Sequence, residues 1–566
     1  MHTNGSHAGN GPFPSSRGTF QESGGRTGGD ETSKRDAAVR SNGRFWIARW
    51  TLATLALTGA ALAAGEREQP AKDDEKEGLH TEVVVTASRK EQPLRDASSM
   101  ATVISADQLD ESPAFLLDQK LRRVPGFSLF RRSSSLIAHP TTQGVSLRGI
   151  GPSGTSRSLV LWNGIPLNDP FGGWVYWNRI PMSALERVEF VRGASSQLYG
   201  SSAMGGVIQL LTPVQRNFRF SGRASVGGLG IRDVDATFAD RAGGVNFQAS
   251  ARLFSSDGYI PVRSDLRGPI DRKANVDFQS VLGGLEYKSL QFGMNYYLEN
   301  RNNGTELQTN RSEMFQVDVG LQRDRWEARW YVQDGVLESA FSRILPDRQQ
   351  EFLTGEQRFD WTASGALLNW QFSDRSLVGA DWRRVAWEDF DQNLAGVYAQ
   401  HLVPLSPRME LQLGSRLDVW KSRGTQASLN PKVGLVLRAA APVTLRGSVY
   451  RGFRAPTLNE LYRPFRVGNI LTEANPDLRA ETLWGAEAGL DLHPTANLLL
   501  RVNSFWSRLD EAVSNVTVSI QPDLILRQRQ NLGGARIRGF EAEFRWRVSS
   551  SWDFEAAYLL SDSTDA

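Results

Sequence analysis

Residues 409–419 read MELQLGSRLDV and alternate between two kinds of side chain. The odd-numbered positions are mostly apolar, and they are Met409, Leu411, Leu413, Ser415, Leu417 and Val419. The even-numbered positions are polar or small, and they are Glu410, Gln412, Gly414, Arg416 and Asp418. Because successive side chains of a strand point to opposite faces, this pattern predicts a strand with one apolar and one polar face.

The same period of two continues from Asn217 onward, for example in residues 245–253. Apolar-out and polar-in strands joined by turns are typical of a transmembrane β-barrel, so we predict a mostly β chain with about 17 antiparallel barrel strands in residues 215–566. A soluble sandwich or propeller is the alternative, but the strands are long and no blade repeat occurs. Short turns are expected at 373–375 and 404–407, and longer loops at 255–275, 301–311, 344–352 and 463–477.

The composition excludes several classes of function. The chain has 566 residues, no cysteine and only six histidines, so disulfides, thiol catalysis and Cys-ligated metals are excluded and no cofactor is expected. The net charge of +3 arises in residues 1–64, because the remaining basic and acidic residues balance at 58 each. A neutral body argues against nucleic-acid binding, which requires a basic face. The sequence contains no combination of a nucleophile and a base that would indicate an enzyme.

Residues 1–64 have the features of an export segment. Residues 1–40 are rich in Gly, Ser, Asn and charge and are expected to be disordered. In residues 41–64, Arg44 and Arg49 precede an apolar run that ends in small residues, as in a secretory signal peptide. A transmembrane anchor is the alternative, although Arg49 interrupts it. No later apolar run is long enough for a helical span, so a membrane form would have to be a barrel.

Residues 65–90 are expected to form a linker that contains Glu82-Val83-Val84-Val85-Thr86-Ala87. A free, extended, apolar hexapeptide near the start of a mature chain is suited to adding a strand to the sheet edge of another protein. An ordinary first strand of the next domain is the alternative.

Residues 91–214 have a compact α+β pattern. We predict a strand at 101–105, a helix at about 107–123 with Asp107 as its N-cap, and a stop at Pro125-Gly126. Residues 158–167 predict a β-hairpin, because Asn163-Gly164 is a favoured two-residue turn between two apolar runs.

Five motifs follow one another in this segment. In this order, after an export signal and residues 82–87, they resemble the plug domain of TonB-dependent outer-membrane receptors over most of residues 81–212. Residues 82–87 resemble the TonB box of that family, and residues 450–462, 475–478 and 531–543 contain stretches that resemble its barrel motifs. The five motifs contain Gln143-Gly144 with Arg148-Gly149, Asn163-Gly164, Glu186–Val191 with Arg192-Gly193, Tyr199-Gly200, and Gly205-Gly206.

The resemblance implies a barrel of about 22 strands with the plug inside its lumen. Since only about 17 strands fit residues 215–566 and the last strand, 552–561, lacks a closing partner, we expect a fragment without about five strands. The resemblance also implies a TonB-energised importer in the bacterial outer membrane, most similar to cobalamin and siderophore receptors, and expected to be a monomer. Haem or oligosaccharide receptors, a passive porin-like barrel and an adhesin stay open as alternatives, although a porin has no use for a plug and a box.

Two barrel carboxylates are expected to face the lumen. In 484–492 and 540–548 the apolar set points outward, so Glu487 and Glu541 point inward. The resemblance implies that such residues pair with the plug residues Arg148 and Arg192, as a plug–barrel latch. The alternative is a set of separate, solvated lumen charges, and a polar lumen predicts a wet rather than a buried latch.

An aromatic loop is the candidate ligand contact. In the family, plug apices of this kind face outward and touch the substrate, and aromatic faces suit a large, partly apolar ligand. Packing against the barrel wall is the alternative. Asp257, Asp265 and Asp271 share one long loop, but their spacing is not a calcium signature, so a calcium site there is not expected. The candidate ligand-contact residues of the aromatic loop are Asn168, Asp169, Phe171, Trp174, Tyr176 and Trp177.

Overall fold

A computed structural model describes residues 83–84, 86, 88–131, 133–150, 155–549 and 551–565. The predicted disordered segment, the signal peptide and residues 65–82 therefore lie outside the described residues. So do Val85 and Ala87 of the hexapeptide.

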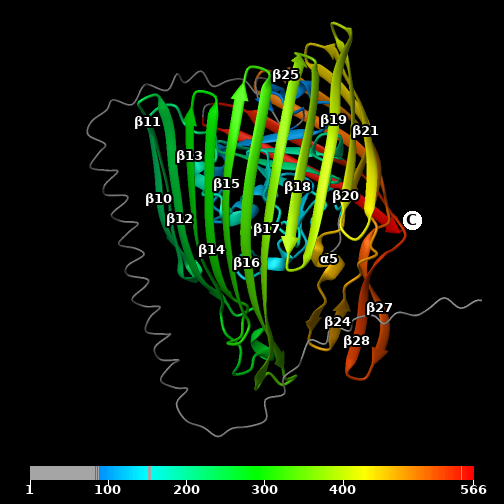
Figure 1. Cartoon of the computed structure of the whole chain (residues 1–566). Helices are drawn as coiled ribbons and strands as arrows, with labels where there is room; N and C mark the ends of the chain where they lie inside the picture. The colour runs from blue at the N-terminus through cyan, green and yellow to red at the C-terminus, as the bar shows by residue number, and fades with distance from the viewer. Residues whose placement is uncertain are drawn as a thin grey trace, which may run out of the picture. The chain divides into compact units, whose positions relative to one another are not determined.

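The long strands form one antiparallel sheet of 17 strands, here called the wall sheet, in which neighbours in space are neighbours in sequence apart from two inserted hairpins. Figure 1 shows strands β11 to β21 running side by side. The strands are β10 (Arg219–Gly227), β11 (Ile231–Ala242), β12 (Val245–Tyr259), β13 (Ala274–Tyr287), β14 (Leu290–Asn302), β15 (Thr309–Arg323), β16 (Trp326–Ile344), β17 (Glu351–Ser373), β18 (Ser376–Trp387), β19 (Phe390–Ser406), β20 (Met409–Lys421), β21 (Thr425–Ala440), β22 (Val443–Arg454), β25 (Glu481–Thr495), β26 (Leu498–Asp510), β29 (Ala535–Arg547) and β30 (Asp553–Asp565).

The predicted alternation is confirmed in β20. Leu413, Leu417 and Val419 are exposed by 40%, 45% and 40%, whereas Arg416 and Asp418 are buried. The apolar face of the wall sheet is therefore its exposed face, and the polar face is covered, which inverts the arrangement of a soluble sheet and suits a lipid-facing wall. Among the described residues, no helix is both long and apolar enough to cross a membrane.

The two ends of the wall sheet are connected differently. At one end, here called the tight-turn end, seven connections have only two residues, as between Ser373 and Ser376. At the other, the long-loop end, the connections include 260–273, 303–308, 345–350, 455–480 and 511–534. The turn expected at 404–407 is instead Pro407-Arg408, because Pro404 stays in β19 opposite Glu410 beside a register irregularity, a place where a strand tolerates proline.

Two of the long connections form a small sheet that the sequence did not predict. Its strand order is β23-β24-β28-β27, with β24 and β28 parallel. It joins residues 455–480 to residues 511–534 outside the wall sheet, and it lies apart from the long strands in Figure 1. The strands are β23 (Phe465–Val467), β24 (Ile470–Glu473), β27 (Val513–Gln521) and β28 (Leu524–Asn531), and helix α5 (Leu458–Tyr462) precedes them.

The plug segment is built on a five-stranded sheet in the order β3-β8-β9-β6-β7. The predicted hairpin is confirmed, since Trp162 pairs with Ile165 across Asn163 and Gly164, which have φ of 47° and 86°. Positive φ at both central residues is what a type I′ turn requires. The strands are β3 (Ala101–Ser105), β8 (Arg187–Arg192), β9 (Gly206–Leu211), β6 (Leu159–Trp162) and β7 (Ile165–Pro166), with β1 (Val83–Val84) paired to β2 (Gln92–Pro93) and β4 (Phe127–Leu129) paired to β5 (Val145–Leu147).

The helix expected at 107–123 is wrong in extent. It begins one residue earlier, at Ala106, with Ser105 as N-cap in a capping box with Gln108. It ends at Glu111, just before Pro113, which cannot continue a helix. The helices are α2 (Ala106–Glu111), α3 (Leu117–Lys120) and α4 (Ser196–Tyr199), and the 3-10 turns are η1 (Leu94–Asp96), η2 (Leu121–Arg123), η3 (Pro140–Thr142), η4 (Trp177–Arg179), η5 (Met182–Ala184), η6 (Gly228–Gly230) and η7 (Ser264–Leu266).

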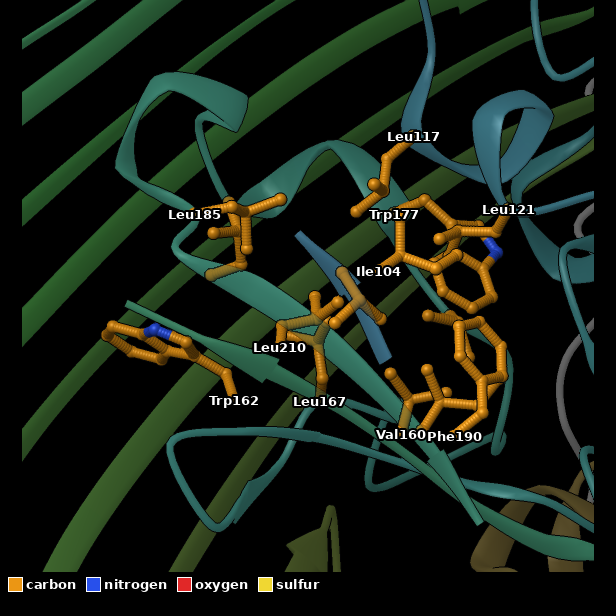
Figure 2. Packing of buried hydrophobic residues seen from close by; sticks show 14 of the residues in the cluster. Ile104, Leu117, Leu121, Val160, Trp162, Leu167, Trp177, Leu185, Phe190 and Leu210 are labelled. Atoms are coloured by element: carbon orange, nitrogen blue, oxygen red, sulfur yellow. The ribbon is translucent and has the colours of Figure 1, made fainter. Parts of the chain in front are cut away.

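The plug has its own apolar core. Figure 2 shows Ile104, Leu121 and Trp177 close to Phe190, with Val160 and Leu210 beside them. These side chains come from β3, η2, η4, β8, β6 and β9, so the core joins the sheet to the helical turns on one side. The same cluster includes Leu282 of β13, so the plug core continues onto the wall sheet.

Candidate functional site

Arg148, at the end of β5, contacts both predicted wall carboxylates. Its Nε and Nη2 donate to Glu541 at 3.1 and 2.9 Å, and its Nη1 donates to Glu487 at 2.8 Å. One guanidinium thus binds two carboxylates from β25 and β29, with the forked geometry that makes arginine suited to such pairs.

Arg192, at the end of β8, reaches the same place from another plug strand. Its Nη1 lies 3.3 Å from Glu541 and its Nη2 lies 2.5 Å from Glu543. Of the two predicted carboxylates, Arg192 contacts Glu541 and not Glu487, and Glu543 was missed by the sequence analysis. The sequence did contain a signal for Glu543, because Glu543 has the same parity as Glu541 and therefore lies on the same face of the strand. We call Arg148, Arg192, Glu487, Glu541 and Glu543 the middle cluster, since the carboxylates lie near the middle of their strands.

The expectation of a wet latch is wrong. The side chains of Arg148 and Arg192 are 1% and 0% exposed, and those of Glu487 and Glu541 are fully buried. The plug fills the space beside the polar face of the wall, so lumen polarity does not mean solvation here. Burial alone would lower the pKa of Arg148, but the charges of Glu541 and Glu487 raise it above its ordinary value. The cluster is therefore a desolvated ion network.

Local backbone geometry explains how Arg148 reaches the wall. Arg148 and Gly149 have φ of 57° and 71°, so the chain turns sharply as β5 ends. At the neighbouring Gly126, an added Cβ would lie 3.0 Å from Glu541 Oε1 and 3.3 Å from Arg148 N. The Pro125-Gly126 stop predicted from the sequence thus also lets the backbone approach the ion pair closely.

A second buried ion cluster, missed by the sequence analysis, lies at the long-loop end. Arg157 of the plug donates through Nε to Glu481 at 2.9 Å. Arg454, the last residue of β22, donates to the same Glu481 at 2.5 Å and to Glu460 at 2.7 and 3.0 Å. We call Arg157, Arg454, Glu460 and Glu481 the rim cluster. Glu481 has the parity of Glu487, so the alternation could have found it.

The rim cluster includes a loop helix as well as plug and wall. Glu460 belongs to α5, where it also forms a capping box with Thr457. The backbone N–H of Asn459 in α5 donates to the carbonyl of Phe171 in the plug loop at 3.0 Å. Arg529 of β28 donates to the carbonyls of Asn459 and Arg463 at 2.9 and 2.7 Å. The loop helix is thus tied to the plug, to β22 and to the small sheet.

The predicted ligand loop is buried in this conformation. Asn168 and Asp169 are 6% and 2% exposed, and the four aromatic residues are 0–2% exposed. Phe171 stacks on Phe359 of β17 at 5.5 Å between ring centroids and lies 4.8 Å from Trp387 of β18. Tyr176 lies against Tyr297 of β14, and Trp177 packs in the plug core. The geometry favours the alternative of packing against the wall, and a ligand contact stays a prediction.

Asp169 is a buried carboxyl at the turn of this loop. Its Oδ1 accepts from the Gly172 N–H at 2.7 Å, whereas Oδ2 has no hydrogen-bond partner among the described residues. Burial raises its pKa to about 7, although the Gly172 N–H and the charge of Arg179 act in the opposite direction. Asp169 therefore changes charge near neutral pH.

The described part of the hexapeptide is docked on the plug and is not free as expected. Val84 pairs with Gln92 and is buried in a small apolar cluster with Leu94 and Val103. Thr86 donates from its N–H and its hydroxyl to Glu189 Oε2 at 2.8 and 2.7 Å, and its carbonyl accepts from the Tyr199 hydroxyl at 3.0 Å. A partner strand could pair with these residues only after they leave the plug.

Arg89 follows the hexapeptide and is held between two aromatic rings. Its guanidinium carbon lies 4.4 Å from the ring centroid of Tyr199 in the plug and 4.9 Å from that of Tyr398 in β19. It also lines a polar cavity of about 520 Å³ between plug and wall, together with Asn163 and Arg329. The segment after the hexapeptide therefore borders the space that separates plug from wall on this side.

The remaining motif residues are close-approach positions. Gln143 accepts through its carbonyl from the Val175 N–H at 3.0 Å. At Gly206, with φ of 136°, an added Cβ would meet the Val191 carbonyl at 2.4 Å, so no other residue fits between β8 and β9. The other five glycines also face a neighbouring surface: Gly144 faces Phe130, Gly149 faces Ser561, Gly193 faces Tyr450, Gly200 faces Arg416 and Asp418, and Gly205 faces Ser158.

The three loop aspartates do not converge. Asp271 accepts from Arg348 Nε at 2.9 Å, Asp265 pairs with Arg263, and Asp257 lies 3.6 Å from Lys273. Within the described ranges, no group of three or more His, Asp or Glu side chains is arranged to hold a metal ion.

Comparisons with known proteins agree with this architecture. Residues 93–207 match the family model for the TonB-dependent receptor plug domain, and residues 217–566 match that for the TonB-dependent receptor-like β-barrel. The chain is 24% identical over 454 residues to the vitamin B12 transporter BtuB of Photobacterium profundum, covering 76% of this chain and 70% of that protein. It is 24% identical over 540 residues to an iron-regulated outer membrane virulence protein of Vibrio cholerae, covering 85% and 78%.

Solved structures share the fold. The siderophore receptor PirA from Acinetobacter baumannii superposes with a TM-score of 0.65 at 15% identity, covering 82% of this chain and 80% of that one. The alcaligin receptor FauA from Bordetella pertussis superposes with a TM-score of 0.61 at 16% identity, covering 88% and 86%. With a plug tied into a strand-built wall and family models that match both parts, the chain belongs to the TonB-dependent receptor family.

Proposed function

We propose that this chain is an active importer in the bacterial outer membrane, driven by the TonB complex of the inner membrane. The observation that carries the proposal is the docking of the described hexapeptide residues: Val83 and Val84 pair with β2, and Thr86 is held by Glu189 and Tyr199, so a partner strand could replace this pairing. The plug is joined to the wall by buried ion pairs, so passage of a large ligand requires work on the plug.

The proposed cargo is a large, scarce ligand of the cobalamin or ferric siderophore class. Support comes from the names of the relatives, which are vitamin B12 transporters, an iron-regulated outer membrane protein and siderophore receptors. A passive pore is less favoured because the plug is fixed to the wall by two buried ion clusters. Since the relatives are named as transporters and receptors, transport is proposed and catalysis is not.

The test separates binding from energised uptake. Val84→Pro removes the N–H with which this residue can join a partner strand, so uptake of radiolabelled cobalamin or ferric siderophore should be lost while surface binding persists. Val84→Ile is the matched control, because it keeps the N–H and the apolar side chain. Equal uptake by the proline and isoleucine variants, or uptake that persists in cells without TonB, would contradict the proposal.

A further inference from the structure

A row of arginines lies on the outward face of the wall sheet. In the register of β22, β25, β26 and β29, Arg451 is opposite Trp484, Trp484 is opposite Arg508, and Arg508 is opposite Arg536. In the next outward row, Trp506 is opposite Arg538. Like charges directly opposite each other destabilise a sheet, so the pairing of Arg508 with Arg536 suggests that an anion lies between them.

The row is only partly neutralised by the protein. Arg508 Nε lies 2.9 Å from Asp510, and Arg538 Nη2 lies 3.1 Å from Asp562, yet these arginine side chains remain 51% and 74% exposed. Arg536 is exposed and makes no ion pair or hydrogen bond through its side chain with any residue that the structure describes. The outward row therefore has spare donors for an anion.

The outward face is hollowed next to this row. A groove of about 1030 Å³ runs over β21, β22, β25, β26, β29 and β30, with Arg538 and Asp562 at one end. Its floor consists of small residues in register, since Gly447 is opposite Ala488 and Ala488 is opposite Ser504. Its edges include Val449, Trp506 and Phe540. The groove is apolar along its length and charged at one end.

The depth of the row fits a membrane interface. Arg508, Arg536 and Arg538 lie about 9–11 residues from the tight-turn ends of β26 and β29, which is the length that a tilted strand needs to cross a bilayer. Trp484 and Trp506 lie in the same two rows, at 44% and 43% exposure. Tryptophan is enriched at this level, where one edge of the ring is apolar and the other is hydrated.

We propose that this surface binds an anionic membrane lipid that carries a phosphate monoester, with the phosphate among Arg508, Arg536 and Arg538 and an acyl chain in the groove. Arginine presents paired donors that match phosphate oxygens, and the small residues of the floor leave room for a chain in contact with Trp506 and Phe540. A soluble phosphate would use only the charged end. The inference rests on the proposed outer-membrane setting and does not depend on which ligand is imported.

The first test uses the full chain without substitution. Folded protein in detergent is mixed with phosphatidic acid and phosphatidylcholine of the same acyl chains, and retained lipid is counted by native mass spectrometry. Phosphatidic acid should be retained in preference, and glycerol 3-phosphate should not displace it. Equal retention of the two lipids would overturn the proposal, as would full displacement by glycerol 3-phosphate, which would indicate a phosphate site without a chain site.

Two variants locate the site. Replacing Arg508, Arg536 and Arg538 by Gln should weaken phosphatidic acid retention by about fivefold for each arginine removed. Ala488→Phe, which fills the groove, should reduce retention of both lipids. Arg311→Gln is the control, since Arg311 is also outward and 48% exposed but pairs with Glu313 in β15, away from the groove. Unchanged retention in the triple variant, or an equal loss in the control, would overturn the proposal. Lipid retention is measured without transport, so it can fail or succeed independently of ligand uptake.

Discussion

The middle cluster and the rim cluster are two buried ion networks that join the plug to the wall in different ways. The middle cluster places two plug arginines on three wall carboxylates, and no loop residue takes part. The rim cluster contains one plug arginine, two wall residues at strand ends and Glu460 of the loop helix. We infer that the middle cluster holds the plug in place, which we call the holding role. The rim cluster couples the position of the loop helix α5 to the plug, which we call the reporting role.

Glu541→Ala tests the holding role and should have the largest effect. Glu541 contacts both Arg148 and Arg192, so its loss leaves two buried guanidinium groups short of a partner. Breaking a buried pair costs about 3–5 kcal/mol, and the free energy of unfolding in urea should fall by an amount in that range.

A double-mutant cycle with Arg148→Ala gives the control. Coupling near zero between Glu541→Ala and Arg148→Ala would show that the two residues act separately and would remove the holding role. Hydrogen exchange in α5 should stay unchanged in the Glu541 variant.

Glu481→Ala tests the reporting role. Glu481 binds Arg157 and Arg454, but it lies at the end of β25, where hydration after the substitution is easier, so we expect a loss of about 3 kcal/mol, at the lower end for a buried pair. The result that distinguishes this variant from Glu541→Ala is faster hydrogen exchange across residues 455–480, measured by mass spectrometry. If α5 exchanges as slowly as in the unsubstituted chain, the rim cluster does not hold the loop.

The titration of Asp169 gives a pH-dependent test of the plug loop that contacts α5 at the long-loop end. Its pKa is raised from 3.8 to about 7, so its stabilising contribution is complete below the unfolded value and is lost as pH rises through about 7. Between about pH 6 and pH 8 the free energy of unfolding should fall by roughly 1–2 kcal/mol from this group. Asp169→Asn should remove that part of the pH dependence, and the same slope in both proteins would assign it elsewhere.

Tyr199→Phe should have the smallest effect. It removes the hydroxyl that donates to the Thr86 carbonyl but keeps the ring beside Arg89, so the loss is about 1 kcal/mol. The measurable result is faster hydrogen exchange at residues 83–88, with both ion clusters unaffected. Slower or equal exchange would mean that Glu189 alone holds Thr86.

The alternation of side chains predicted the wall well, because burial on one face of a strand repeats every second residue. It placed Glu487 and Glu541 inward, and the same rule applied to neighbouring residues would have included Glu543 and Glu481. The early end of helix α2 could also have been predicted, because Pro113 lies inside the expected span of 107–123.

What could not be predicted depends on contacts between distant segments. The burial of Phe171 follows from its position opposite Phe359 and Trp387, which lie some 190–215 residues later in the chain. The dry state of the middle cluster also depends on how completely the plug fills the space, and no local pattern encodes that. The docking of Thr86 on Glu189 is of the same kind.

Strands β16 and β17 have 19 and 23 residues and are the two longest strands of the wall sheet. A tilted strand crosses a bilayer in about 9–11 residues, so the remaining ~12–14 residues of β17, at about 3.3 Å each and a tilt of about 45°, would extend roughly 30 Å above the lipid surface. This hairpin would be the first part of the receptor that an approaching molecule, antibody or phage meets. The height of this hairpin would then set the capture radius of the protein at the cell surface.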